Sequence, residues 1–83
     1  MYIVYAIKSE VDNRIYVGFT DNLTRRLREH DSGKTKSTKG FRPWKLFYTE
    51  RVSERMEARK REKYLKSGSG KEFLKQILNG PVA

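Results

Sequence analysis

The chain has 83 residues and a formal net charge of +9, so we expect a single small domain over residues 1–83 with a thin hydrophobic core. It has no cysteine and one histidine, which excludes disulfides and argues against a structural zinc site. We expect no signal peptide, and no apolar run approaches the roughly 18 residues of a membrane-spanning helix, so a cytoplasmic protein without membrane association is predicted.

Two segments near the N-terminus are rich in β-branched and aromatic residues and predict β-strands: "YIVYAI", residues 2–7, and "RIYVGF", residues 14–19. Asp12 and Asn13 between them favour a hairpin turn. Neither strand alternates cleanly between apolar and polar residues, which indicates a sheet that is covered on both faces. "WKLFYT", residues 44–49, is the third strand candidate.

Three helices are expected between and after these strands. Asp21 is a suitable N-cap for a helix over residues 22–32. Ser53 can cap a second helix, which stops near residue 67, and a third is expected over residues 70–79. The resulting order ββαβαα predicts an α+β fold, an α/β sandwich with helices on both sides of the sheet.

The excess positive charge lies in the second part of the chain. Basic and acidic residues are equal in number over residues 1–33, so residues 34–83 carry the whole excess. A polar, glycine-punctuated loop is predicted over residues 32–43, and five cations lie in it or just after it without an acid among them: Lys34, Lys36, Lys39, Arg42 and Lys45. This clustering favours nucleic acid as a polyanionic partner over a membrane surface. A contribution to solubility is the alternative reason for the charge.

The first predicted helix places Leu23, Arg26, Leu27 and His30 on one face. The leucines must face the core, so Arg26 and His30 are expected along its edge rather than in water. A guanidinium held beside a sheet suits a phosphate. The structural alternatives are an arginine whose stem alone is buried and a histidine whose ring bonds to a backbone carbonyl.

Glu62 lies on the stripe of the second helix that best faces the core, within roughly 60° of Ala58 and Leu65 on the helical wheel. One interpretation is a structural salt bridge, for which Arg26 is a candidate partner. The other is a ligand for a hard divalent cation, because Mg²⁺ commonly uses one or two protein carboxylates with water and substrate phosphate. The helix alone does not decide between them.

Two tyrosines lie inside predicted strands. Tyr5 shares its face with Ile3 and Ile7, and Tyr16 shares its face with Gly18. The missing side chain of Gly18 leaves room for a phosphate, or for the region of the second helix, to approach the strand closely. Core aromatics whose hydroxyls reach the rim of the sheet are the structural alternative.

Four motifs in order resemble the GIY-YIG nuclease superfamily: "IVY" (3–5), "YVG" (16–18), "LTRRLREH" (23–30) and "EARKREKYLKSGSG" (57–70). More narrowly, the chain is similar to the small bacterial members described as excinuclease-like or predicted endonucleases. The resemblance covers nearly the whole chain. It implies a three-stranded antiparallel sheet flanked by helices, and hydrolysis of DNA phosphodiester bonds with one Mg²⁺ or Mn²⁺.

The resemblance also implies roles for the tyrosines. Tyr5 takes the place of the family tyrosine proposed as general base on the attacking water. Tyr16 takes the place of the second-motif tyrosine, which helps to organise water and phosphate, and Gly18 that of the motif's glycine. Ile3 stands where the first motif has a glycine. A phenol with a pKa near 10 accepts a proton only if positive surroundings depress that pKa, which is the expectation for Tyr5.

Three further residues take family roles by the same resemblance. Arg26 takes the place of the helix arginine that stabilises the phosphate, and Glu62 that of the metal-binding glutamate. His30 matches a histidine found in several members, with a less settled role.

The first functional hypothesis is a metal-dependent DNA endonuclease, or a nuclease-like module of DNA repair or processing, acting on duplex or branched DNA. The second is a non-catalytic nucleic-acid-binding protein, with the cations of the loop on phosphates and Phe41 or Trp44 stacked on bases. The third is a small protein-interaction domain. Family members with defined targets carry additional DNA-binding domains, so whether a protein partner supplies targeting is left open.

Overall fold

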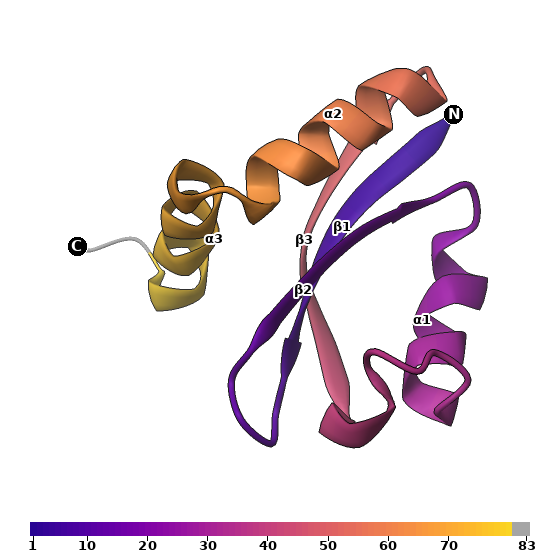
Figure 1. Cartoon of the computed structure of the whole chain (residues 1–83), viewed down its shortest axis with the longest axis vertical. Coiled ribbons are helices and arrows are strands. Elements are labelled where there is room, and N and C mark those ends of the chain that lie inside the picture. The colour runs from indigo at the N-terminus through magenta and orange to yellow at the C-terminus, as the bar shows by residue number, and fades with distance from the viewer. Residues whose placement is uncertain (81–83) are drawn as a thin grey trace.

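The computed structural model describes residues 1–80 and contains three strands and three α-helices in the order ββαβαα, with a short 3₁₀ helix before the last strand. The strands pair antiparallel in the order β2-β1-β3 (Figure 1). The predicted fold class and element order are therefore confirmed. Within residues 1–80, each helix is too short or too polar to cross a membrane. The elements are β1 (Tyr2–Ser9), β2 (Ile15–Thr20), α1 (Leu23–Ser32), η1 (Lys39–Phe41), β3 (Trp44–Val52), α2 (Arg55–Lys66) and α3 (Gly68–Asn79).

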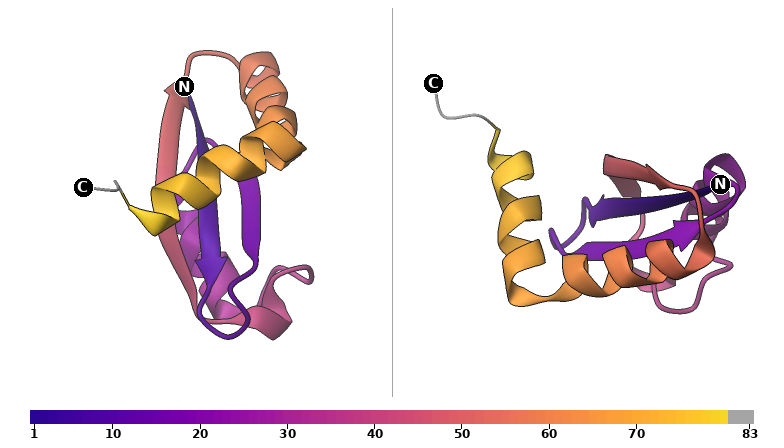
Figure 2. Two further views of the ribbon diagram at one scale, coloured as in Figure 1. Left: turned by 90° about the vertical axis from the view of Figure 1, so that its left-hand side faces the viewer. Right: turned by 90° about the horizontal axis from the view of Figure 1, so that it is seen from above.

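Both faces of the sheet are covered, as the missing polar alternation predicts. Val4 and Ala6 of the central strand β1 are buried against α2 and α3 on one face. Tyr5 and Ile7, their neighbours in the strand, are buried on the opposite face, which carries α1. Figures 1 and 2 show α1 on one side of the sheet and α2 with α3 on the other. Side chains of β1 therefore reach two separate cores.

The ends of α1 and α2 differ from the prediction. Asn22, rather than Asp21, is the N-cap of α1, because the extended backbone of Asn22 lets its side-chain oxygen accept a hydrogen bond from the Arg25 N–H at 3.1 Å. The N-cap of α2 is Glu54 rather than Ser53, and the Glu54 side chain makes no capping bond. The last strand continues three residues beyond the predicted end, to Val52, because it stays paired with β1 up to that residue.

The elbow between α2 and α3 depends on one glycine. Ser67 caps α3 by accepting a hydrogen bond from the Gly70 N–H at 3.3 Å, and the helix begins two residues before the predicted start. A Cβ atom on Gly70 would collide with the backbone carbonyl of Tyr64 and the Cα of Leu65. Figure 2 shows α3 turned steeply away from the axis of α2. Only a residue without a side chain allows the two helices to pack this closely at the turn.

Gly70→Ala is therefore expected to destabilise the protein. The added methyl group meets backbone atoms that cannot move independently, so the free energy of unfolding should fall by about 1–3 kcal/mol. Gly68→Ala is the matched control, because a Cβ there meets nothing within 4 Å. Urea unfolding of both variants and the wild type measures the difference, and equal stability of the two variants would contradict this account of the elbow.

Candidate active site

A chain of buried hydrogen bonds connects β1, α1 and the segment between α1 and β3. The Tyr5 hydroxyl lies 2.8 Å from His30 Nε2, and His30 Nδ1 lies 2.8 Å from the Thr38 hydroxyl. Thr38 donates its own proton to the carbonyl of Thr35 at 3.3 Å. The Thr38 oxygen therefore accepts from Nδ1–H of His30, and the unprotonated Nε2 accepts from Tyr5. Tyr5, His30 and Thr38 have no exposed surface.

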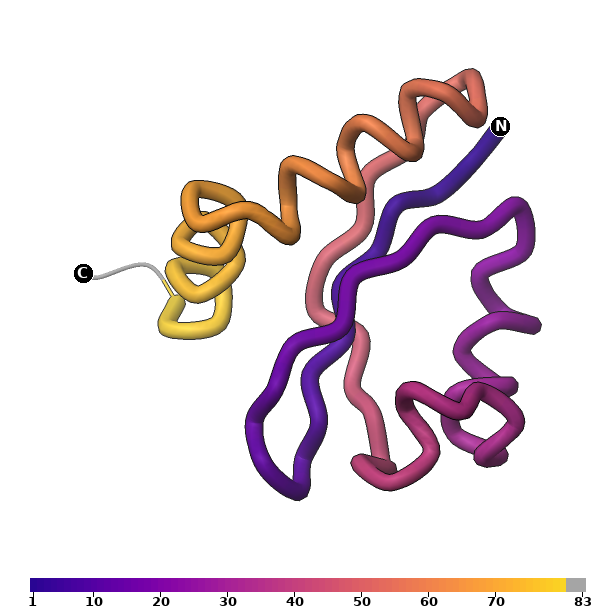
Figure 3. Tube along the Cα trace, in the orientation of Figure 1, coloured from indigo at the N-terminus to yellow at the C-terminus, as the bar shows by residue number. Residues whose placement is uncertain are grey.

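The segment predicted as a polar loop folds back beside α1 (Figure 3), and Thr38 within it is fully buried. The Trp44 indole N–H donates to the Thr38 carbonyl at 2.9 Å, and the Ser9 hydroxyl donates to the Phe41 carbonyl at 2.7 Å. The Asp31 carboxylate accepts the backbone N–H of Trp44 at 3.1 Å. These bonds from β1, α1 and β3 fix the segment, and the buried Thr38 hydroxyl in turn fixes the ring of His30.

Burial keeps both members of the Tyr5–His30 pair neutral. Desolvation raises the pKa of Tyr5 to about 12, although the nearby Arg26 cation acts in the opposite direction. Desolvation lowers the pKa of His30 to about 4, and Arg26 adds to that lowering. The expected depression of the tyrosine pKa is therefore wrong for this structure, because desolvation outweighs the positive surroundings.

The second tyrosine and the glycine lie on the adjacent edge strand. The register pairs Tyr5 with Gly18, and a Cβ on Gly18 would lie 2.7 Å from the Tyr5 hydroxyl oxygen and 3.1 Å from the Tyr16 ring. The group that approaches this glycine closely is thus the Tyr5 side chain. Tyr16 is half-buried, with its ring centroid 4.9 Å from that of His30 and 6.4 Å from that of Tyr5. The structure therefore brings together both tyrosines and the histidine.

Arg26 lies at the open side of this cluster, with 31% of its side chain exposed. Its Nη1 donates to the Glu29 carboxylate at 3.0 Å and to the Thr35 hydroxyl at 3.4 Å. Burial opposes the charge of Arg26, but the bond to Glu29 and the nearby hydroxyls of Tyr5 and Tyr16 outweigh burial and raise its pKa. Both of these hydrogen bonds use Nη1 of the guanidinium.

Glu62 has a different partner from the one considered above. Its carboxylate is 22% exposed and pairs with Lys66 at 3.3 Å, so the proposed salt bridge to Arg26 is wrong. The helical face is as predicted, because Ala58 and Leu65 are both fully buried. The negative charge of Glu62 contributes to the raised pKa of Tyr5, after the larger effects of burial and neighbouring groups. Glu62 thus acts electrostatically on the tyrosine cluster from α2, which lies on the other side of the sheet from α1.

The donor set fits a weakly ligated divalent cation rather than a closed metal cage. Over residues 1–80, no three His, Cys, Asp or Glu side chains come close enough together to hold a metal ion. A partly buried carboxylate such as Glu62 suits Mg²⁺, which keeps several waters and takes its remaining ligands from substrate phosphates.

The five cations predicted to bind DNA are all exposed: Lys34, Lys36, Lys39, Arg42 and Lys45. The aromatic residues near them are not free to stack on bases. Trp44 is 8% exposed and its indole is hydrogen-bonded, while the guanidinium of Arg14 lies 3.5 Å above the ring of Phe41. Base stacking on Trp44 or Phe41 is therefore a wrong expectation, and the loop offers charge alone.

Sequence reasoning missed three residues of the cluster: Thr35, Thr38 and Glu29. Threonines in a polar, glycine-punctuated segment give no signal of burial, and Thr38 is buried because His30 and Trp44 hydrogen-bond to it. The position of Glu29 does contain a signal, since it lies three residues after Arg26 on the same helix face and is a natural ion-pair partner.

The sequence profile described as the GIY-YIG catalytic domain matches residues 1–76. The chain belongs to the GIY-YIG catalytic domain family. This membership indicates a nuclease-type hydrolase in general terms.

Relatives support the assignment over the whole GIY-YIG domain. A UPF0213 protein of Staphylococcus haemolyticus is 40% identical over 77 residues, which cover 92% of this chain and 93% of that protein. The solution NMR structure of a UPF0213 protein from Bacillus halodurans is similar, with a TM-score of 0.58 and 34% identity, covering 98% of this chain and 89% of that one. The human structure-specific endonuclease subunit SLX1 is 36% identical over 50 residues, which are 55% of this chain and 18% of that protein.

The buried histidine of this GIY-YIG domain predicts a pH dependence of stability. His30 has a pKa of about 4 in the folded protein against an ordinary histidine pKa of 6.5, so the unfolded chain binds more protons between these two pH values. The stabilisation is complete above pH 6.5 and is lost as the pH falls toward 4, with a loss of about 2 kcal/mol by pH 5. His30→Gln keeps one donor and one acceptor but does not titrate. Urea unfolding from pH 7.5 to 5 should show a slope in the wild type that the variant lacks, and parallel slopes would contradict the assignment.

Proposed function

We propose that the protein is a metal-dependent DNA endonuclease. The observation that carries the proposal is the meeting of Tyr5 and Tyr16, from two paired strands, with His30 and Arg26 of α1 in one site. This site lies in a chain that the GIY-YIG catalytic domain matches over residues 1–76. A role in DNA repair or processing in the cytoplasm is part of the same proposal, with branched DNA favoured by the similarity to a structure-specific endonuclease subunit.

Arg26 is proposed to bind the scissile phosphate. Its guanidinium is positioned by Glu29 and Thr35 through Nη1, and its remaining N–H groups are proposed to donate to the phosphate oxygens. The positive charge of Arg26 lowers the pKa of His30. A phosphate bound to Arg26 offsets that charge, so protonation of His30 becomes easier. Donors fixed in advance at the developing charge are the largest source of stabilisation in reactions of this kind.

Glu62 is proposed to hold Mg²⁺ or Mn²⁺. Such an ion, when bound, neutralises charge on phosphate oxygens and lowers the pKa of a bound water. The protein's own contribution is the placement of the carboxylate on the buried side of α2, one helical turn before Lys66. Lys66 keeps the carboxylate oriented at the surface in the free protein.

Tyr5 is proposed as general base together with His30. Because the Tyr5 hydroxyl donates to His30 Nε2, its oxygen can take a proton from the attacking water as its own proton passes to the imidazole. Neither group then has to become charged before the reaction begins. Tyr5 is fully buried, so this role requires the covering side chains to move when the phosphate binds. Tyr16, half-buried beside it, is proposed to position the water.

The exposed cations between α1 and β3 and at the start of β3 are proposed to contact the DNA backbone. The aromatic rings near these cations, Trp44 and Phe41, are engaged in contacts within the protein. The cations are therefore expected to position the duplex without reading its sequence. Choice of target then comes from DNA structure or from a protein partner. Binding of DNA without cleavage is the second candidate function, and it is separated from the first by the next experiment.

Glu62→Gln should abolish metal-supported cleavage while leaving the fold intact. Glu62 pairs only with the exposed Lys66, so the free energy of unfolding without metal should change by about 1 kcal/mol or less. Glu57→Gln removes the same charge from an exposed position on α2 and serves as the control. Nicked, flapped, branched and plain duplexes are incubated with Mg²⁺ or Mn²⁺ and each protein. Cutting by the Glu62 variant at the wild-type rate would remove Glu62 from the mechanism, and wild-type binding without any cutting would favour the second function.

Tyr5→Phe should reduce the single-turnover cleavage rate by about 10²-fold or more, the usual contribution of a general base. It should also cost about 1–3 kcal/mol of stability, because His30 Nε2 is left buried without a partner. Tyr16→Phe is the comparison, since that residue is half-buried and should lose rate without a similar loss of stability. Rates are measured well below both melting temperatures. A Tyr5 variant that cuts at the wild-type rate would assign the base to another group.

A further inference from the structure

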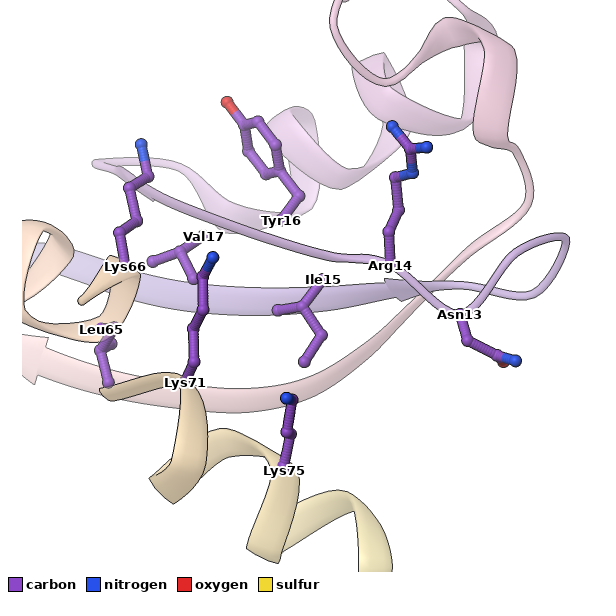
Figure 4. A pocket seen from close by; sticks show the side chains of 9 residues that line it. All are labelled: Asn13, Arg14, Ile15, Tyr16, Val17, Leu65, Lys66, Lys71 and Lys75. Atoms are coloured by element: carbon purple, nitrogen blue, oxygen red, sulfur yellow. The ribbon is translucent and has the colours of Figure 1, made fainter. Parts of the chain in front are cut away.

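A cavity of about 560 Å³ lies between the edge strand β2 and the elbow where α2 passes into α3 (Figure 4). Apolar side chains of Ile15, Val17 and Leu65 line it, and the last two are buried. Tyr16 also lines the cavity and is the residue that the proposed active site shares with it. The cavity and the proposed active site therefore adjoin each other at Tyr16 of the edge strand.

Three lysines surround this apolar lining: Lys66, Lys71 and Lys75. Arg14 also lines the cavity, with its guanidinium over the ring of Phe41. None of the residues lining the cavity is acidic. Arg14, Lys66 and Lys75 have carboxylate partners outside it, at 2.7, 3.3 and 4.0 Å, whereas Lys71 has none within 4.0 Å among residues 1–80. Exposed pairs of this kind contribute little to stability, so a phosphate can replace the carboxylates at small cost.

The two lysines of α3 are held in place by the helix elbow. Lys71 and Lys75 are one turn apart, about 6 Å along the helix axis, and therefore lie on one face. Figure 4 shows both side chains extending from α3 toward β2, beside Lys66. Gly70 makes this possible, because the close contact of α3 with the end of α2 directs that face toward the edge of the sheet.

We infer that this groove binds an unpaired strand of the DNA substrate next to the cleavage site, an inference that rests on the proposed endonuclease function. The surrounding cations match the phosphates of a strand, and the apolar lining matches the faces of bases. A double helix keeps its bases stacked inside, so it offers phosphates to the cations but nothing to the apolar lining. An unpaired strand offers both. The groove thus favours DNA with a single-stranded arm over plain duplex.

Fluorescence anisotropy without divalent metal tests the inference, because binding is then measured without cleavage. The probes are a blunt duplex and the same duplex with a single-stranded arm at either end, all at one fixed salt concentration. The variant is Lys71→Ala with Lys75→Ala. The control, Lys60→Ala with Lys63→Ala, removes the same charge from exposed positions of α2 that do not line the cavity. Circular dichroism verifies that both proteins are folded.

The groove variant should weaken binding of the armed DNA roughly tenfold, as expected for loss of two phosphate contacts, and should affect the blunt duplex no more than the control does. Equal weakening of all probes by both variants, or a wild type without preference for the armed DNA, overturns the inference. Cleavage assays with Mg²⁺ or Mn²⁺ separate it from the proposed function. A protein that prefers armed DNA but never cuts loses the endonuclease proposal and keeps the groove, whereas a protein that cuts without this preference loses the groove alone.

Discussion

The hydrogen bond between Tyr5 and His30 is the interaction on which the rest of the site depends. It joins the central strand to α1 at 2.8 Å in a region without exposed surface. Removing Tyr5 leaves His30 Nε2 buried without this bond, and removing His30 does the same to the Tyr5 hydroxyl, which costs more than the bond itself contributes. The same ring of His30 holds Thr38 on its far side, so the segment between α1 and β3 is folded back by this bond as well. One buried pair thus sets the position of a strand, a helix and a loop.

The Tyr5–His30 pair is uncharged, and this property affects both the stability of the fold and the proposed proton transfer. Burial raises the pKa of Tyr5 and lowers that of His30, so neither carries charge in the free protein. Charge is confined to the open side, where Arg26 is held by Glu29. In the proposed mechanism, a phosphate bound at Arg26 offsets the cation that lowers the pKa of His30. Proton transfer from Tyr5 to His30 would then be easier when substrate is bound.

The sequence predicts the parts of this structure that follow from local pattern. Strands without polar alternation indicate a sheet buried on both faces, and the stripe of Ala58 and Leu65 orients α2 correctly. The partner of Arg26 is not predicted, because a neighbour on the same helix, Glu29, competes with the more distant Glu62. The burial of Thr38 is not predicted either, since bonds from residues far along the chain cause it. The cationic groove is assembled from three elements, so no segment of sequence contains its pattern.

Cations lie on both sides of the sheet, and the edge strand β2 runs between the two groups. Tyr16 lies on this strand, with the exposed cations of the segment after α1 beyond one face and the groove of α2 and α3 beyond the other. The central strand cannot serve in this way, because both its edges are paired. A polyanion that crosses β2 meets cations before and after the tyrosine cluster, while Gly18 lets the Tyr5 side chain lie directly over the strand. If the proposed function holds, the edge of β2 is the line along which both groups of cations would hold a phosphodiester chain, with one phosphate beside Arg26.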